Sequence, residues 1–78
     1  MSIHVEVTDT FNGEANYCWV KRHNIAVDKS KPLSEAAIVR RAKAWAGWNG
    51  LRCKREHYGF IIRLTPHGMC QTMFITLG

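Results

Sequence analysis

The chain has 78 residues, of which 46% are hydrophobic, and its eleven Lys and Arg against six Asp and Glu give a net charge of +5. This length supports one domain, residues 1–78, with a core one layer deep, and the hydrophobic content argues against intrinsic disorder. No apolar run approaches the about 20 residues that span a bilayer. No signal peptide is recognisable, so we expect a cytoplasmic protein that does not bind membranes. The positive charge favours an anionic partner, either nucleic acid or an acidic protein surface.

The first predicted element is a β-strand at residues 3–8. Its residues alternate strictly, with Ile3, Val5 and Val7 on one face and polar residues on the other, a pattern typical of a half-buried strand. The stretch that follows is rich in turn formers and contains Asn12-Gly13, a strong turn dipeptide. We therefore expect the chain to turn here toward a second strand.

The second predicted strand covers residues 17–27, which are rich in aromatic and β-branched side chains. Trp19 and Val20 are adjacent and both apolar, so they face opposite ways in a regular strand. Since only one face of this strand is expected to be buried, we predict a β-bulge near residues 21–23 that resolves the conflict.

Residues 34–48 form the predicted helix, because they alone keep a helical period. Ser34 is a good N-cap, and Glu35 places a negative charge at the positive end of the helix dipole. Asn49-Gly50 supplies the predicted stop, since glycine readily takes the left-handed conformation that ends helices. The apolar stripe that we expect to pack on a sheet consists of Leu33, Ile38, Val39, Ala42, Trp45 and Ala46.

Three further strands are predicted after the helix, at residues 51–57, 60–65 and 69–77. We expect a turn at Tyr58-Gly59 and place Phe60 on the buried face of the strand that follows. The order of elements is therefore β-β-α-β-β-β. The fold class is α+β: an antiparallel β-sheet with one amphipathic helix packed on one face.

Four cysteine and histidine residues of the second half of the chain raise the possibility of a metal site. Cys53, His57, His67 and Cys70 are a set that a structural zinc site can use, but their spacings lack the common Cys-x2-Cys pair. Core thiols and turn histidines are the favoured interpretation, and the zinc alternative stays open. The odd number of cysteines favours reduced thiols over disulfides.

No spacing selects a nucleophile and a base, and no glycine-rich phosphate loop opens a helix, so we expect no enzymatic activity and no cofactor.

The candidate binding residues are basic side chains on the helix and on the strand after it, together with one aromatic side chain near the helix end. The cations would contact phosphates or acidic side chains, and the tryptophan, expected to be exposed, would stack on a base or a partner. These candidates are Arg40, Arg41, Lys43, Trp48, Arg52, Lys54 and Arg55. Further cations at Lys21, Arg22 and Arg63 and further aromatics at Tyr17, Trp19 and Tyr58 could extend this surface. The alternative is an ordinary solvated face with the aromatic side chains in the core.

The second face of the sheet has no predicted cover. If that face is apolar, it could form a homodimer contact, with Trp19 or Phe74 at the contact.

Nearly the whole chain takes part in a wider pattern. It consists of VEVTDTFNGEANYCWVKR at residues 5–22, AAIVRRAKAWAGWNG at residues 36–50, LRCKRE at residues 51–56 and GMCQTMFIT at residues 68–76. This pattern resembles small uncharacterised proteins of bacteriophages and mobile elements. The resemblance supplies no catalytic or binding motif.

The resemblance implies a protein that acts by stoichiometric binding in the cytoplasm of a host cell. Such accessory proteins block a host machine, including CRISPR effectors, or attach to nucleic acid. The leading functional hypothesis is therefore a non-enzymatic, anti-CRISPR-like inhibitor that binds a host defence protein or ribonucleoprotein complex through its basic surface. The alternative is a small nucleic-acid-binding protein that uses the same basic residues to contact phosphates.

Overall fold

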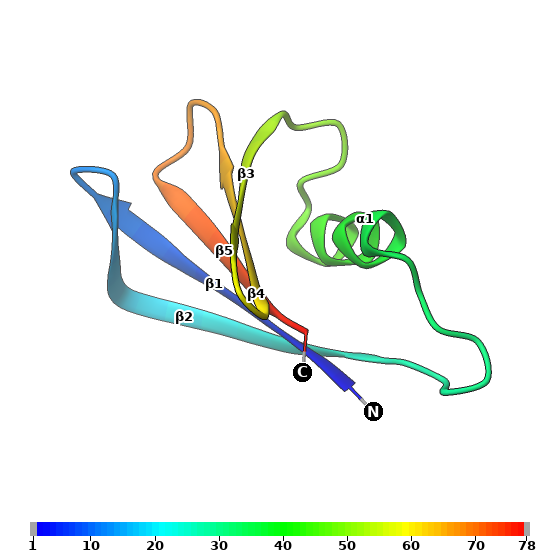
Figure 1. Cartoon of the computed structure of the whole chain (residues 1–78). Coiled ribbons are helices and arrows are strands. Elements are labelled where there is room, and N and C mark those ends of the chain that lie inside the picture. Colours follow the sequence, from blue (N-terminus) through cyan, green and yellow to red (C-terminus); the bar gives the residue numbers. More distant parts are fainter. Residues whose placement is uncertain (1, 78) are drawn as a thin grey trace.

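The computed structural model describes residues 2–77 and has the predicted order of elements. The strands are β1 (Ser2–Phe11), β2 (Glu14–Ala26), β3 (Cys53–Tyr58), β4 (Ile61–Pro66) and β5 (Gln71–Thr76), and the helix is α1 (Glu35–Ala46). All neighbouring strands are antiparallel, in the order β2-β1-β5-β4-β3. The chain passes from the β2 edge to the β3 edge through α1, which places the helix on one face (Figure 1). The predicted α+β fold class is thus confirmed.

The core lies between the helix and the sheet face that it covers. Alternation on β1 buries Val5 and Val7, which pair with Ile75 and Met73 on the central strand β5. Ile38, Val39 and Ala42 of α1 are buried against this layer, as the helical period predicts. Within residues 2–77, the buried apolar cluster consists of Ile3, Val5, Val7, Ile25, Val27, Ile38, Val39, Ala42, Trp48, Ile62, Leu64, Met73 and Ile75.

The helix has the predicted start but ends earlier than predicted. The Ser34 hydroxyl accepts a hydrogen bond from the Ala37 N–H at 3.2 Å, which satisfies one free amide of the first turn. At the other end, Gly47 has a φ of 75° and its N–H donates to the carbonyl of Ala44. Glycine adopts this left-handed conformation without steric cost. The predicted stop at Asn49-Gly50 is therefore wrong, because Gly47 already ends the helix.

The early helix end reverses the prediction for one tryptophan. The N–H of Trp48 donates to the carbonyl of Lys43 at 2.8 Å, so the chain folds back directly after the helix. Its side chain is only 2% exposed and belongs to the core, so the prediction of an exposed Trp48 is wrong. Trp45, placed on the apolar stripe by the sequence, is half-buried and packs against the core.

The irregular part of β2 lies earlier than predicted. Thr8 pairs with Val20 but Thr10 pairs with Ala15, so four β2 residues, 16–19, lie opposite Asp9 alone. The Asp9 carboxylate holds this looped-out segment by accepting hydrogen bonds from the Cys18 N–H and the Asn16 amide, each at 2.9 Å. The expected bulge at residues 21–23 is wrong, because those residues pair regularly with β1.

The turn between β3 and β4 also differs from the prediction. Tyr58 pairs with Ile61, so the two-residue turn consists of Gly59 and Phe60, with glycine at a φ of 59°. Phe60 is therefore a turn residue, 78% exposed, and its predicted burial is wrong. β4 starts one residue later than predicted, at Ile61, and Ile62 and Leu64 are buried as predicted.

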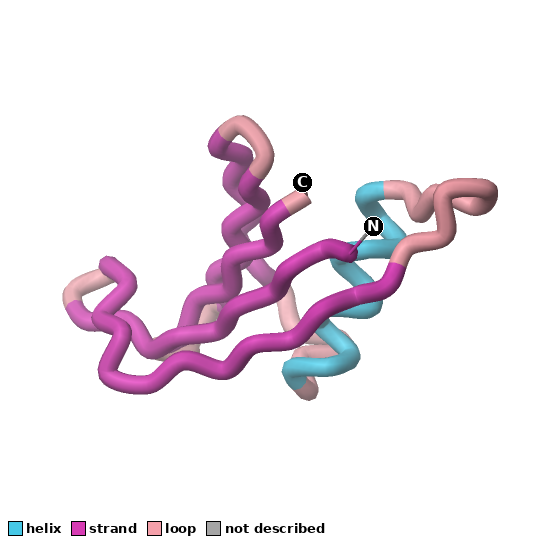
Figure 2. Tube along the Cα trace, turned by 90° about the horizontal axis from the view of Figure 1, so that it is seen from below, coloured by secondary structure: helices cyan, strands magenta, loops and turns pink. Residues whose placement is uncertain are grey.

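The β1–β2 turn protrudes from the rest of the molecule. Figure 1 and Figure 2 both show it at the end of the sheet far from α1. The molecule is consequently elongated, with extents of 41 × 23 × 21 Å. Within residues 2–77, no helix has the length and apolar character required to cross a lipid bilayer.

Candidate functional site

The helical candidates lie around the helix in different environments. Arg40 and Arg41 are exposed. Lys43 is half-buried, and its Nζ donates a hydrogen bond to the carbonyl of Leu51 at 2.7 Å, which ties the helix end to the loop after it. Two positions along a helix correspond to a rotation of about 200°, so Arg41 and Lys43 point to opposite sides of α1. Lys43 therefore has a structural contact, whereas the two arginines are free to meet a partner.

The candidates in the loop before β3 and on β3 do not form one patch either. Arg52 is exposed in the loop before β3. Lys54 pairs with Thr65 and Arg55 with the buried Leu64, so these neighbours point to opposite faces of the sheet. Arg55 faces the helix and forms an ion pair with Glu35 at 3.5 Å. With Trp48 in the core, the seven predicted residues are not brought together.

Lys21, Arg40 and Arg41 are exposed cations on the helix side of the molecule that have no acidic partner among residues 2–77. The four ion pairs in that part of the chain involve only two carboxylates, Glu6 and Glu35, and use none of these three. One of them, Lys21, pairs across strands with the buried Val7 and so shares the face that α1 covers. The others are on the helix, and one of them, Arg41, lies one turn before Trp45 on the same side. We call Lys21, Arg40 and Arg41 the helix-side cations.

A hollow of about 180 Å³ opens at the C-terminal end of α1. It combines residues from β1, β2, β5, the helix and the segment directly after the helix, and all three tryptophans of the chain contribute to its wall. Trp19 forms an open part of this wall, with 38% of its surface exposed. The lining residues of this tryptophan hollow are Val7, Trp19, Lys21, Trp45, Ala46, Trp48 and Gln71.

Neighbouring side chains fix the rings in the wall. His23 stacks on Trp45 with 5.0 Å between ring centroids and an angle of 11° between their planes. The Nζ of Lys21 lies 5.9 Å from the centroid of Trp19, within the range of a cation–π contact. These contacts hold flat aromatic surfaces beside a positive charge at the hollow.

Two polar groups of the wall, the Gln71 amide and the Trp48 indole N–H, take part in no side-chain hydrogen bond within residues 2–77. Gln71 is half-buried, whereas Trp48 is only 2% exposed. Gln71 offers one donor and one acceptor group, and Trp48 offers a donor only. Sequence patterns gave no sign of Gln71, because its role depends on β5 lying next to β1.

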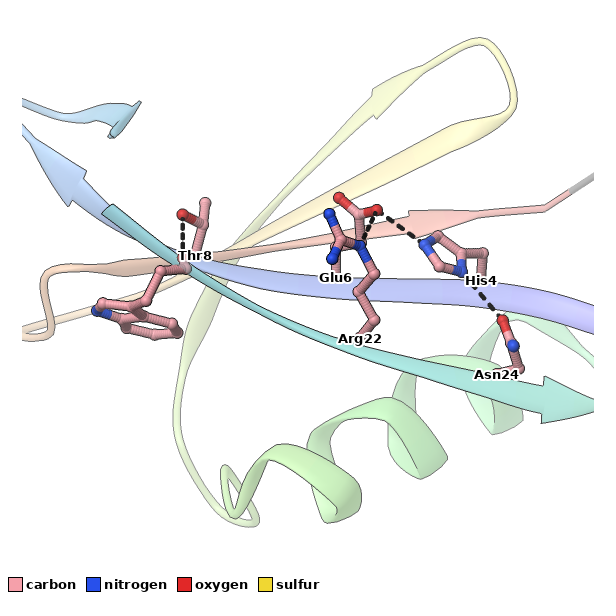
Figure 3. Close-up of polar contacts among 6 residues, drawn as sticks. His4, Glu6, Thr8, Arg22 and Asn24 are labelled. Atoms are coloured by element: carbon pink, nitrogen blue, oxygen red, sulfur yellow. Dashed lines mark hydrogen bonds and ion pairs between the residues drawn. The ribbon is translucent and has the colours of Figure 1, made fainter. Parts of the chain in front are cut away.

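A polar network occupies the sheet face away from the helix, on β1 and β2 (Figure 3). His4 Nε2 lies 2.8 Å from Glu6 Oε1, and His4 Nδ1 lies 3.0 Å from the amide oxygen of Asn24. Arg22 donates to the same Glu6 oxygen at 3.3 Å. Two acceptors around one imidazole favour its doubly protonated form. The bonds to Asn24 and Glu6 raise the pKa of His4, and the bond from His4, followed by that from Arg22, lowers the pKa of Glu6.

Arg63 on the same open face serves to hold the β1–β2 turn. Its guanidinium lies 5.6 Å from the Phe74 ring centroid and donates to the Thr72 hydroxyl at 3.0 Å. It also donates to the carbonyl of Gly13 at 3.1 Å, across 50 positions of sequence. Phe74 is thus half-buried under a charged group, and the open face is polar, so a homodimer contact through Phe74 remains a prediction without support from this surface.

The residues considered for zinc are spread over the sheet. Cys53 pairs with Pro66 and His57 pairs with Ile62. Cys53 and His57 are four positions apart on β3, which corresponds to about 13 Å along the strand. His57 instead contacts Glu35 at 2.8 Å. Among residues 2–77, no three His, Cys, Asp or Glu side chains are grouped closely enough to hold a metal ion. Cys18, Cys53 and Cys70 are free thiols.

Comparison of the chain with protein-family models, with curated proteins and with solved structures finds no match. The resemblance to bacteriophage and mobile-element proteins therefore remains a prediction.

Proposed function

We propose that the protein is a non-enzymatic nucleic-acid-binding protein that contacts the phosphate backbone with its helix side. The observation that carries this proposal is the presence there of three exposed cations that have no acidic partner in residues 2–77: Lys21, Arg40 and Arg41. Cations that are not neutralised within the protein retain their full attraction for phosphate.

The distribution of acidic residues supports the choice of this side. Glu6 neutralises Arg22 on the open face, and Glu35 neutralises Arg55 at the start of the helix. Glu56 accepts a hydrogen bond from Tyr58 at 2.6 Å on the face that also carries Lys54. The open face therefore mixes both signs of charge, whereas the middle of the helix carries positive charge alone.

The test is binding of a fluorescein-labelled oligonucleotide of about 12 nucleotides, followed by anisotropy. We expect binding at about 50 mM salt that weakens steeply toward 200 mM. The reason is that binding releases counterions from the nucleic acid, and this release becomes less favourable as the salt concentration rises. Absence of any binding at the lower salt concentration, to single strands and duplexes alike, overturns the proposal.

A second candidate function is inhibition of a host defence complex, as in the leading hypothesis from the sequence. Arg40 and Arg41 favour it as well, since exposed arginines also bind acidic side chains of a protein surface. Pull-down from a host lysate with and without nuclease separates the two functions. A defence component retained after nuclease treatment supports inhibition by protein contact, and its loss with the nucleic acid supports direct nucleic-acid binding.

A further inference from the structure

The tryptophan hollow has the dimensions and chemistry of a site for one flat heterocycle. Its volume of about 180 Å³ is below the roughly 300–1,000 Å³ of pockets for drug-sized ligands, so it suits a single small ring system. Trp19 and Trp45 supply aromatic surface, and Gln71 and Trp48 supply polar groups that no residue of the described chain uses.

The negative charge at the C-terminal end of the helix determines which part of a nucleotide can enter the hollow. The hollow lies at the C-terminal end of α1, where the helix dipole is negative and repels phosphate. A neutral base is not repelled. Lys21 lies at the hollow, and Arg41 lies one helical turn before Trp45, so both are placed to contact phosphates next to a base held inside.

We propose that the tryptophan hollow binds one unpaired nucleobase, with Trp19 stacking on the ring and Gln71 contacting its edge. The glutamine amide carries one donor and one acceptor group, which can pair with the donors and acceptors on the edge of a base. This inference rests on the proposed function for the source of the base, a nucleic-acid strand. It adds that the strand is single, because a paired base is not available to the hollow.

The first test compares single-stranded and duplex oligonucleotides of the same length. We expect the single strand to bind more tightly, and Trp19→Ala to weaken its binding by about 5- to 140-fold, the effect typical of losing one base stack. Phe60→Ala is the matched control, because Phe60 is 78% exposed at the β3–β4 turn and outside the hollow. It should bind as the wild type does. Circular dichroism establishes that both variants are folded, and Trp19→Phe, which keeps a smaller ring, should bind with intermediate affinity.

The second test concerns the edge contact from Gln71. Gln71→Leu should weaken binding of a single strand while leaving the residual binding through phosphate contacts. Unchanged affinity in Gln71→Leu overturns the role of Gln71.

The two proposals can fail separately. Binding of single strands and duplexes with equal affinity, unchanged in Trp19→Ala, overturns the base site and leaves the phosphate contacts intact. To test the base site without a phosphate backbone, tryptophan fluorescence is titrated with adenosine monophosphate and with ribose 5-phosphate. Quenching by the nucleotide alone supports the base site even if no oligonucleotide binds, and quenching by neither compound overturns it.

Discussion

Neutralising two of the three helix-side cations should flatten the salt dependence of nucleic-acid binding. Each phosphate contact contributes about −0.7 to the slope of log K against log salt for a single strand. Three contacts, from Lys21, Arg40 and Arg41, give a slope of about −2.1, which is about 18-fold weaker binding between 50 and 200 mM salt. The double variant Arg40→Gln/Arg41→Gln retains one contact, with a slope of about −0.7 and a loss of about 2.6-fold over the same range.

The assay is anisotropy of a labelled single strand at several salt concentrations. The control double variant Lys29→Gln/Lys54→Gln removes the same net charge from exposed positions in the β2–α1 loop and on the open face of the sheet. It should keep a slope near that of the wild type. Equal flattening in both double variants would show that net charge alone drives binding, and an unchanged slope in Arg40→Gln/Arg41→Gln would place the nucleic acid on another surface.

Three further predictions concern stability and are measured by urea unfolding. Trp48→Ala should cost about 3–5 kcal/mol, the usual effect of emptying a buried aromatic site, and a loss below about 1 kcal/mol would contradict the 2% exposure of this residue. Ser34→Ala should cost about 1 kcal/mol by removing the N-cap hydrogen bond, and no change in the unfolding midpoint would mean that the cap contributes nothing. Folding raises the pKa of His4 above 6.5 and lowers that of Glu6 below 4.5, so their pair stabilises fully between these values. This contribution disappears as pH rises through the folded pKa of His4 or falls through that of Glu6. The stability of the wild type should therefore fall as pH rises above 6.5, and His4→Gln should show a smaller fall over the same range.

The fold could be predicted from the sequence because local patterns and tertiary packing agree over most of the chain. The alternation at Ile3, Val5 and Val7 selects the face that packs on α1. Ser34 begins the helix where its hydroxyl can cap it. The one-residue error at Phe60 arose because a glycine-first turn and a strand start have overlapping sequence signatures.

The end of the helix at Gly47 and the burial of Trp48 depend on tertiary structure and were not predicted. Gly47 lay inside an apparently continuous helical period, where one glycine costs only about 1 kcal/mol, so the pattern did not mark it as the end. Once the chain folds back there, Trp48 enters the core, and helical spacing no longer describes its position.

The tryptophan hollow could not be predicted because it depends on the order of the strands. Trp19 and Lys21 were recognised as possible contacts, but Gln71 joins them only because β1 lies between β2 and β5. Hydrophobic periodicity predicts which face of each strand is buried, but it does not predict which strands lie beside it in the sheet. The polar network of His4, Glu6, Arg22 and Asn24 likewise requires the register of β1 on β2.

The most direct test of the account is an NMR titration of the labelled protein with a short single-stranded oligonucleotide. We predict that the largest shift changes occur at the indole N–H signals of Trp19, Trp45 and Trp48 and at the Gln71 side-chain amide, with smaller changes along the helix at Arg40 and Arg41. Changes confined to the open face of the sheet, or a spectrum that does not respond to the oligonucleotide, would contradict binding through the helix side.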